Sequence, residues 1–162
     1  LEILKEPNVE LVVNLQGDEP LMNIQDIRNL YDHMIRSKAE FGTLASIILD
    51  KNLFENDNVV KVITKEALDE TKFLEADNFT RKISKKTKNS YHHLGIYCYK
   101  LETLKKFVAF DQSKNEINNK LEQLRALDNN IKINVALAKS SPIGVDTEED
   151  FVAIKKIMEY KS

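Results

Sequence analysis

The chain has 162 residues, which suits one domain with a buried core, and its 42% hydrophobic and 31% charged residues predict a soluble globular protein. A formal net charge of −2 excludes a globally basic surface, so we expect no nucleic-acid partner. No apolar run approaches the roughly 20 residues that span a bilayer, so we expect no membrane partner either.

The first predicted elements are a strand, a polar turn and a helix. Residues 11–15 form an almost continuous apolar run, which is typical of a parallel-sheet strand buried on both faces. Residues 16–20 contain Gly and Pro and predict a turn. Asn23 is the predicted N-cap of the helix that follows, and Asp26 lies near its positive end. The apolar stripe of this helix is Ile27, Leu30, Tyr31, Met34 and Ile35.

Strands and helices alternate along the rest of the chain, except that residues 69–90 are polar and give no assignment. This alternation predicts an α/β layered fold with a mostly parallel sheet. No repeat, low-complexity tract or linker divides the chain, so residues 1–162 are predicted to form a single domain. The predicted strands cover residues 43–49, 59–64, 94–99 and 131–138, and the predicted helices include Leu101 to Val108, Asn115 to Leu127 and a last helix capped by Asp146 and Glu149.

Cys98 is the only cysteine and lies in an apolar run. This setting favours a buried structural thiol over a catalytic one. Because one cysteine can form no internal disulfide, a reducing compartment fits, and we expect a cytoplasmic protein.

Asp18 and Asp146 are the two candidate metal ligands. Each follows a predicted strand and precedes a predicted helix, and ligands bind beyond the carboxyl ends of strands in open α/β sheets. Carboxylates are ligands that Mg²⁺ prefers. Either residue could instead cap a neighbouring amide, and the sequence alone leaves both alternatives open.

Three further polar segments have simpler interpretations. The adjacent residues His92 and His93 cannot share a strand face, so a two-histidine metal site is not expected. Residues 121–125 could be an exposed helix face, and the basic run 81–88 could be a solvated loop or could steer phosphate. The chain has no Gly-x-Ser-x-Gly and no Gly-x-x-x-x-Gly-Lys, which excludes a nucleophile elbow and a P-loop.

Ordered segments from Val9 to the end of the chain resemble one enzyme family. They are Val13-Asn14-Leu15-Gln16-Gly17-Asp18-Glu19-Pro20, Asn58-Val59-Val60-Lys61-Val62, Phe79-Thr80-Arg81, His93-Leu94-Gly95-Ile96-Tyr97, Leu121-Glu122-Gln123-Leu124-Arg125 and Val145-Asp146-Thr147-Glu148-Glu149-Asp150. In this order they resemble the 3-deoxy-manno-octulosonate cytidylyltransferases, also called CMP-Kdo synthetases. The resemblance covers the carboxyl-terminal two-thirds of such an enzyme. It implies a three-layer nucleotidyltransferase fold, like that of nucleotide-diphospho-sugar transferases, with the first strands missing.

The resemblance also implies a reaction and a partner set. CMP is transferred from CTP to the eight-carbon sugar acid Kdo in the presence of Mg²⁺, giving CMP-Kdo and pyrophosphate for lipopolysaccharide synthesis. The sugar's anomeric hydroxyl attacks the α-phosphate. Family enzymes commonly form homodimers, so a homodimer is expected.

Site residues follow from the same resemblance, position by position. Asp18 and Asp146 match metal-binding, catalytic aspartates, and Gln16 matches a substrate-contacting glutamine. Arg81 suits the sugar carboxylate because a guanidinium can hold it at two points. The remaining residues of the implied sugar pocket are His93, Tyr97, Glu122 and Gln123.

Two alternatives to this function stay open at the level of sequence. The family's glycine- and arginine-bearing triphosphate loop has no counterpart here, so the chain could be a non-catalytic fragment or a remnant that binds a partner. A cytidylyltransferase for another sugar acid, such as sialic acid, is the second alternative. The Leu-Glu-Gln-Leu-Arg segment favours Kdo.

Overall fold

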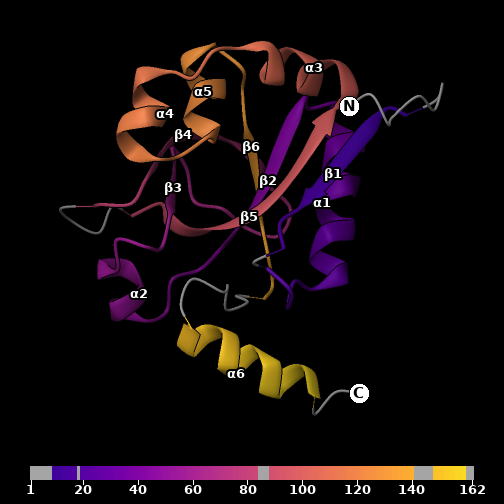
Figure 1. Cartoon of the computed structure of the whole chain (residues 1–162). Helices are drawn as coiled ribbons and strands as arrows, with labels where there is room; N and C mark the ends of the chain where they lie inside the picture. The colour runs from indigo at the N-terminus through magenta and orange to yellow at the C-terminus, as the bar shows by residue number, and fades with distance from the viewer. Residues whose placement is uncertain (1–8, 18, 84–87, 141–147, 160–162) are drawn as a thin grey trace.

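Six strands form one sheet in the computed structural model of the chain, which describes residues 9–17, 19–83, 88–140 and 148–159 (Figure 1). Their order across the sheet is β1-β5-β2-β6-β4-β3, and β3 also pairs with β5. The strands are β1 (Leu11–Leu15), β2 (Phe41–Ser46), β3 (Lys61–Thr64), β4 (Phe73–Thr80), β5 (Ser90–Lys100) and β6 (Asn134–Leu137).

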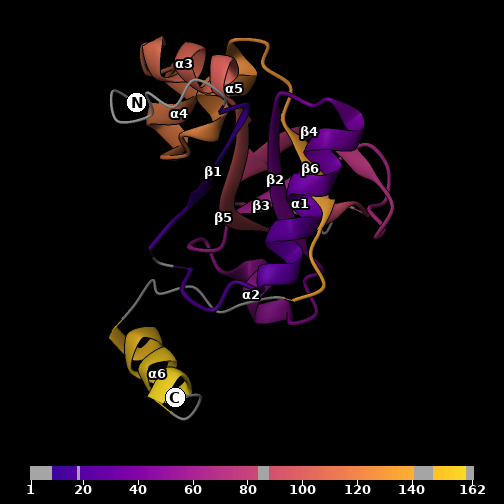
Figure 2. The same cartoon turned by 90° about the vertical axis from the view of Figure 1, so that its right-hand side faces the viewer.

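Helices lie on both faces of this sheet. Residues of α1 pack against one face, whereas residues of α3 and α5 pack against the other (Figures 1 and 2). The expected α/β arrangement of three layers is therefore confirmed. The helices are α1 (Ile24–Ser37), α2 (Lys51–Glu55), α3 (Leu101–Ala109), α4 (Lys114–Asn119), α5 (Gln123–Asp128) and α6 (Glu148–Glu159).

The directions of the described strands differ from the prediction. Only β2 and β6 pair in parallel, and the other pairings are antiparallel, so the sheet is mixed rather than mostly parallel. One reason is that no helix separates β3 from β4, and such a connection favours antiparallel neighbours. Because β1 and β2 both run antiparallel to β5, the strands β1, β2 and β6 share one direction. Their carboxyl ends therefore lie at the same end of the sheet.

The long strand β5 organises the sheet. One edge of β5 pairs with β2, while its other edge pairs first with β3, through Lys61 opposite His92, and then with β1. Among the described strands, β1 pairs with β5 alone, and its Val13 and Leu15 are 40% and 50% exposed. The predicted burial of β1 on both faces is therefore wrong for the described part of the chain, because β1 lies at an edge of that sheet.

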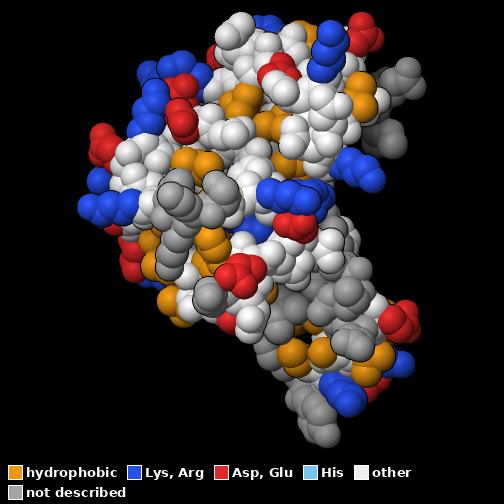
Figure 3. Space-filling model, turned by 90° about the vertical axis from the view of Figure 1, so that its left-hand side faces the viewer, with side chains coloured by type: hydrophobic (Ala, Val, Ile, Leu, Met, Phe, Trp, Pro, Cys, Tyr) orange, Lys and Arg blue, Asp and Glu red, His pale blue; other side chains and the backbone are white. Residues whose placement is uncertain are grey.

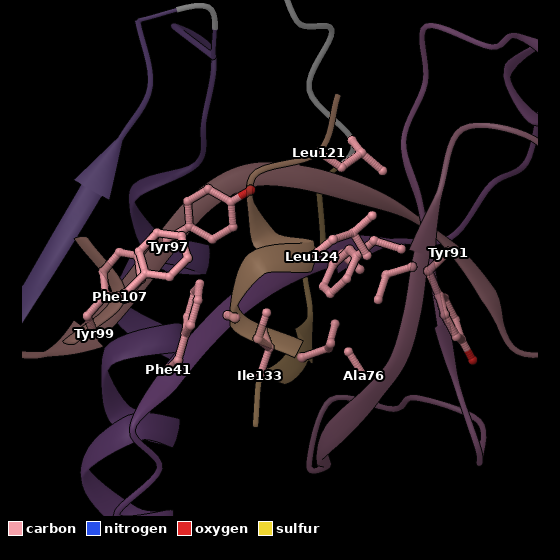
Figure 4. Close-up of a cluster of buried hydrophobic side chains, with 14 of the residues drawn as sticks. Phe41, Ala76, Tyr91, Tyr97, Tyr99, Phe107, Leu121, Leu124 and Ile133 are labelled. Atoms are coloured by element: carbon pink, nitrogen blue, oxygen red, sulfur yellow. The ribbon is translucent and has the colours of Figure 1, made fainter. Parts of the chain in front are cut away.

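The larger hydrophobic core lies between the sheet and helices α3 and α5. Phe41, Tyr97, Tyr99 and Phe107 form an aromatic group within it, with 4.3 Å between the ring centroids of Phe41 and Tyr99 (Figure 4). Such aromatic pairs contribute about 1 kcal/mol each beyond the area they bury. This core fixes the middle of β5, which carries two of the predicted site residues.

The second core lies under α1. Gly42 of β2 lets this helix approach closely, because a Cβ atom at Gly42 would lie 2.6 Å from Met34 Sδ and 2.8 Å from Phe73 Cζ. The predicted N-cap is confirmed, since the Asn23 side chain accepts a hydrogen bond from the Gln25 amide. Cys98 is fully buried in this core, and burial raises the pKa of its thiol to about 11. A structural role for this cysteine, as predicted, agrees with that environment.

The segment predicted as one helix over residues 115–127 is two helices. α4 ends at Asn119, its C-cap Lys120 has a left-handed backbone with φ 52°, and α5 begins at Gln123. The change of direction allows Leu121 and Leu124 to reach the core while α4 keeps its own capping box. β4 forms within the unassigned residues 69–90, because Ala76 and Phe79 bury there despite the polar surroundings.

Helix α6 has a mostly exposed apolar surface. Ile154 is buried, but Phe151, Val152 and Met158 remain about half exposed. Figure 3 shows hydrophobic side chains gathered over this helix at the lower end of the molecule. None of the helices in the described part of the chain has the length and apolarity needed to span a membrane.

Candidate active site

Gln16 and Glu122, which are 106 positions apart in the sequence, meet beside β5. Gln16 follows β1, and its Nε2 donates a hydrogen bond to Glu122 Oε1 over 3.5 Å. Glu122 stands at the N-cap position of α5, so its side chain is set by the turn that separates α4 from α5. The fold thus brings together two of the predicted substrate-binding residues.

Gly95 lies directly under the Gln16 side chain. A Cβ atom at this position would lie 2.8 Å from Gln16 Oε1, so a residue with a side chain would displace the amide. The backbone N–H of Gly95 donates to Glu19 Oε1 over 3.3 Å. The turn after β1 therefore rests on β5 through Gln16 and Glu19. Sequence reasoning missed Glu19, although it belongs to the same motif as Gln16.

His93 is buried, and its ring is fixed by Thr43. The Thr43 hydroxyl lies 2.7 Å from the Ile96 carbonyl and 3.0 Å from His93 Nε2. Because a hydroxyl has one proton, Thr43 donates to the carbonyl and accepts from Nε2–H, which leaves Nδ1 as the acceptor nitrogen of His93. Burial, assisted by the neighbouring His92, lowers the pKa of His93 to about 3. His93 is therefore a neutral hydrogen-bonding group at neutral pH.

Tyr97 and Gln123 lie deeper than the other predicted pocket residues. Each exposes only 3% of its surface, and the Tyr97 ring stacks obliquely against His93 with 5.5 Å between centroids. Gln16 and Arg81 are partly exposed, and Glu122 is exposed. The predicted site residues thus form two layers. His93, Tyr97 and Gln123 are buried, whereas Gln16, Arg81 and Glu122 face solvent.

The charge of Glu122 is influenced by its surroundings. Solvent still reaches its side chain, but packing removes part of its hydration and raises the pKa of its carboxyl group. The positive charge of Arg125 opposes this shift, and the carboxylate of Glu116 adds to it. The carboxylate form of Glu122, which Arg125 favours, can accept hydrogen bonds from hydroxyl groups.

Arg81, at the end of β4, lies between two other segments. Its Nη1 donates to the carbonyls of Asn58, at 2.9 Å, and Asp57, at 3.5 Å, and its Nη2 donates to the Lys120 carbonyl at 3.5 Å. Lys120 immediately precedes the Leu121-Glu122 pair. The guanidinium of Arg81 is thereby held on the side of the sheet where α5 begins.

Lys61 is a buried cation that sequence reasoning did not select. Its side chain has no exposed surface, and its Nζ donates to the Asn56 carbonyl at 2.6 Å and the Arg81 carbonyl at 2.7 Å. Burial lowers its pKa, which Asp57 opposes and Arg81 reinforces. A signal was present in the sequence, because Lys61 interrupts an apolar strand, and lysine is almost never fully buried without partners.

The predicted metal ligands Asp18 and Asp146 lie outside the described residues. Asp26, in the first turn of α1, binds the described chain that follows β6. Its carboxylate accepts hydrogen bonds from the backbone amides of Lys139, at 3.0 Å, and Ser140, at 3.1 Å. It also accepts one from the Ser140 hydroxyl at 2.5 Å. Within the described part of the chain, no group of three or more His, Cys, Asp or Glu residues could hold a metal ion.

Solved structures of known proteins show the same fold. One, titled as the structure of CMP:2-keto-3-deoxy-manno-octonic acid synthetase complexed with CTP, matches 99% of this chain and 66% of its own with a TM-score of 0.84 and 24% identity. Apo UDP-glucose pyrophosphorylase matches 95% of this chain and 56% of its own with a TM-score of 0.67 and 13% identity. The expected nucleotidyltransferase fold is therefore confirmed.

The sequence comparisons are more specific than the fold. The family profile described as "Cytidylyltransferase" matches residues 1–133, and the chain belongs to this family. A 3-deoxy-manno-octulosonate cytidylyltransferase of Bartonella tribocorum is 38% identical over 98% of this chain and 65% of its own length. The protein of the same name from Parvibaculum lavamentivorans is 38% identical over 92% of this chain and 57% of its own length. The chain thus spans about two-thirds or less of these relatives.

Proposed function

We propose that this chain serves the transfer of CMP from CTP to 3-deoxy-D-manno-octulosonate, giving CMP-Kdo and pyrophosphate. The observation that carries the proposal is the contact between Gln16 and Glu122 beside β5, together with the hydrogen bond from Arg81 to the Lys120 carbonyl, two residues before Glu122. The names of the relatives from Bartonella and Parvibaculum support the same reaction. As the resemblance implies, the product would serve lipopolysaccharide synthesis.

The residues of the candidate site suit a polyhydroxylated acid. The Arg81 guanidinium binds the sugar carboxylate, because a planar fork of donors matches two carboxylate oxygens. Gln16 and Glu122 bind sugar hydroxyls, and the acceptor nitrogen of neutral His93 lies in the layer below with Tyr97 and Gln123. Hydrogen bonds from several directions discriminate a hydroxylated substrate from one that lacks the hydroxyls.

The proposed step is an in-line substitution at phosphorus. The anomeric hydroxyl of Kdo forms a bond to the α-phosphorus of CTP, the bond from that phosphorus to the bridging oxygen breaks, and pyrophosphate leaves with the electron pair. The hydroxyl proton passes to solvent. Catalysis of this kind depends on positioning and on stabilising charge, so the fixed places of Gln16, Arg81 and Glu122 are the contribution of the described residues.

Asp18 and Asp146 remain the proposed Mg²⁺ ligands. Two features of the described residues support them: β1 and β6 end at the same end of the sheet, and Asp26 binds the chain after β6 beside the start of α1. Aspartate oxygens are ligands of the kind that Mg²⁺ takes. When bound, the metal would neutralise negative charge on the phosphates.

We also propose a cytoplasmic homodimer built from a single domain. The single cysteine is buried and free, which suits a reducing compartment. Apolar side chains exposed on α6 offer surface that a second subunit could cover. Sedimentation would measure the association, and a monomer at all concentrations would contradict the dimer.

The direct test is an assay of CMP-Kdo and pyrophosphate formation from CTP, Kdo and Mg²⁺. The chain is assayed alone and together with the part of the Bartonella tribocorum relative that it does not match. Turnover in the mixture supports the proposal, and no turnover under either condition overturns it. Kdo binding without turnover would favour the non-catalytic alternative, and preference for sialic acid in competition would replace Kdo as the substrate.

A test of the pocket uses Arg81→Lys, which keeps the positive charge and removes the fork of donors. We expect KM for Kdo to rise about tenfold or more, the equivalent of one lost charge-assisted hydrogen bond, while KM for CTP changes less. Lys132→Met, which changes a charged residue paired with Glu75 on an exposed surface, is the control for general effects. An unchanged KM for Kdo would remove Arg81 from the site.

A further inference from the structure

Lys61 places a positive charge inside the protein, where its hydrogen-bond acceptors among the described residues are backbone carbonyls. It begins β3 and lies between Thr80 of β4 and His92 of β5 in the sheet. The two carbonyls that accept from its Nζ belong to different segments, at Asn56 after α2 and at Arg81 after β4. One buried ammonium therefore connects two chain segments.

The Arg81 side chain completes this connection from the other direction. Its Nη1 donates to the Asn58 carbonyl, two residues after the carbonyl that Lys61 binds. The loop over residues 56–58 is thus held by Lys61 and by Arg81, while Lys61 also holds the backbone of Arg81. We call Lys61, Arg81 and the carbonyls of Asn56 and Asn58 the cation clamp. The clamp restricts where the guanidinium of Arg81 can lie.

Stability alone is a weak reason for a lysine at this position. Removing an ammonium group from water costs several kcal/mol, and hydrogen bonds to neutral carbonyls recover only part of it. An apolar side chain of similar length, such as methionine, would fill the same space without that cost but would leave the Asn56 and Arg81 carbonyls without this donor. What methionine would not supply is the fixed geometry of the Arg81 backbone.

We propose that Lys61 is a positioning residue that holds Arg81 in place for the carboxylate of an acidic sugar. The inference rests on the proposed function, because Arg81 needs a fixed position only if its guanidinium binds the carboxylate of a sugar acid. It extends that function to a residue buried behind the site, which makes no contact with the substrate. Selectivity for sugars that carry a carboxylate would then depend on the cation clamp.

A double-mutant cycle tests the coupling between the two cations. The assembled protein is this chain mixed with the part of the Bartonella tribocorum relative that it does not match. Its Kdo binding is measured by calorimetry without substitution, with Lys61→Met, with Arg81→Met and with both changes. We expect Lys61→Met alone to weaken Kdo binding about tenfold and to leave CTP binding within about twofold. In the Arg81→Met background, the same change should alter Kdo binding less than about twofold, because the group that Lys61 positions is already absent.

Lys65→Met is the matched control, because Lys65 is exposed and follows the same strand. If Lys61→Met does not fold, Lys61→Gln is used in its place, because its uncharged amide can still donate a hydrogen bond. Unchanged Kdo binding in the folded variant overturns the inference and leaves the proposed function standing. Additive losses in the cycle also overturn it, because they indicate general loosening. An unsubstituted protein that binds no Kdo overturns the proposed function together with this inference.

Discussion

The guanidinium of Arg125 contacts the carboxylate of Glu116 at two points and joins α5 to the first turn of α4. Arg125 Nε lies 2.8 Å from Glu116 Oε2, and Nη2 lies 2.5 Å from Oε1. Glu116 also completes the capping box of α4 with Ser113, and Arg125 lies 5.0 Å from the centre of the Phe107 ring. This pair supports the turn from which Glu122 reaches Gln16.

The first prediction is that Glu116→Gln destabilises the protein. The change leaves a largely buried guanidinium without its charge partner, and we expect the free energy of unfolding to fall by about 3 kcal/mol. Urea unfolding at neutral pH measures it. Glu102→Gln is the control, because Glu102 pairs with Lys105 on the exposed surface of α3 and should change stability by less than about 0.5 kcal/mol. Equal effects of the two substitutions would contradict the role given to the Glu116 pair.

Low pH should reduce the difference in stability between the original protein and Glu116→Gln. The hydrogen bond from Arg125 is the largest cause that lowers the pKa of Glu116 in the folded protein. A carboxyl group with a depressed folded pKa contributes stability above its unfolded pKa and loses it as the pH falls through the folded pKa. The gap between the original protein and Glu116→Gln should therefore shrink in acid. A gap that stays constant down to the lowest measurable pH would show that the carboxylate charge is not its source.

The second prediction concerns His93, whose pKa is lowered from 6.5 to about 3 by burial and by His92. The unfolded chain therefore binds a proton that the folded protein excludes between these values. Stability is fully present above the unfolded pKa and falls as the pH drops below it. Between about pH 7.5 and about pH 5, His93 alone should remove roughly 2 kcal/mol.

The variant His93→Gln provides the comparison, because its amide can still donate toward Thr43. Its absolute stability can differ from that of the original protein, so the quantity to compare is the loss between the two pH values. We expect the variant to lose roughly 2 kcal/mol less than the original protein. His33 and His92, whose pKa values burial also lowers, keep their own contributions in both proteins. The same pH dependence in both would refute the assignment to His93.

How far the sequence predicts this fold depends on the kind of signal. The strand over residues 11–15, the N-cap at Asn23 and the burial of Cys98 follow from local patterns and agree with the structure. The directions of β3, β4 and β5 do not follow from such patterns, because strand pairing depends on contacts between distant residues. The sequence also gives no signal for the end of α4 at its C-cap Lys120, since neither glycine nor proline marks it.

The candidate site divides in the same way. The resemblance selected Gln16, Arg81 and Glu122, and the fold brings Gln16 to Glu122 and Arg81 to Lys120, which the spacing in the sequence could not show. Thr43 and Lys61 act behind other residues, one on His93 and one on Arg81. Such supporting residues do not bind substrate themselves, so no sequence motif for substrate binding identifies them. A charged residue inside an apolar strand was the one available signal, and it applied to Lys61 alone.

The third prediction is that Lys38→Gly stabilises the protein. Lys38 is the C-cap of α1 and adopts the left-handed conformation with φ 55°. A residue with a Cβ atom is strained there by about 1 to 2 kcal/mol, and glycine is not. We expect a gain of roughly 0.5 to 1 kcal/mol in the free energy of unfolding, measured in urea, after glycine's greater freedom in the unfolded chain is allowed for. A loss of stability would mean that the lysine side chain contributes more than its backbone strain removes.

The fourth prediction contrasts two glycines whose added Cβ atoms would meet different neighbours. Gly95→Ala would meet the terminal oxygen of Gln16, which is the flexible end of a partly exposed side chain. Gly42→Ala would meet Met34 and Phe73, where Met34 is packed in the core beneath α1. The first side chain can move away at little cost, whereas the second group resists displacement. We therefore expect losses of less than about 1 kcal/mol for Gly95→Ala and about 1 to 3 kcal/mol for Gly42→Ala.

Function should respond in the opposite order. Displacing the Gln16 amide breaks its hydrogen bond with Glu122, so Gly95→Ala should weaken Kdo binding about tenfold in the assembled protein. Gly42→Ala lies on the α1 side of the sheet and should leave Kdo binding nearly unchanged at temperatures where the protein is folded. Calorimetry for binding and urea unfolding for stability give both quantities. If Gly42→Ala weakened Kdo binding more than Gly95→Ala, the Gln16–Glu122 contact could not be what arranges the sugar pocket.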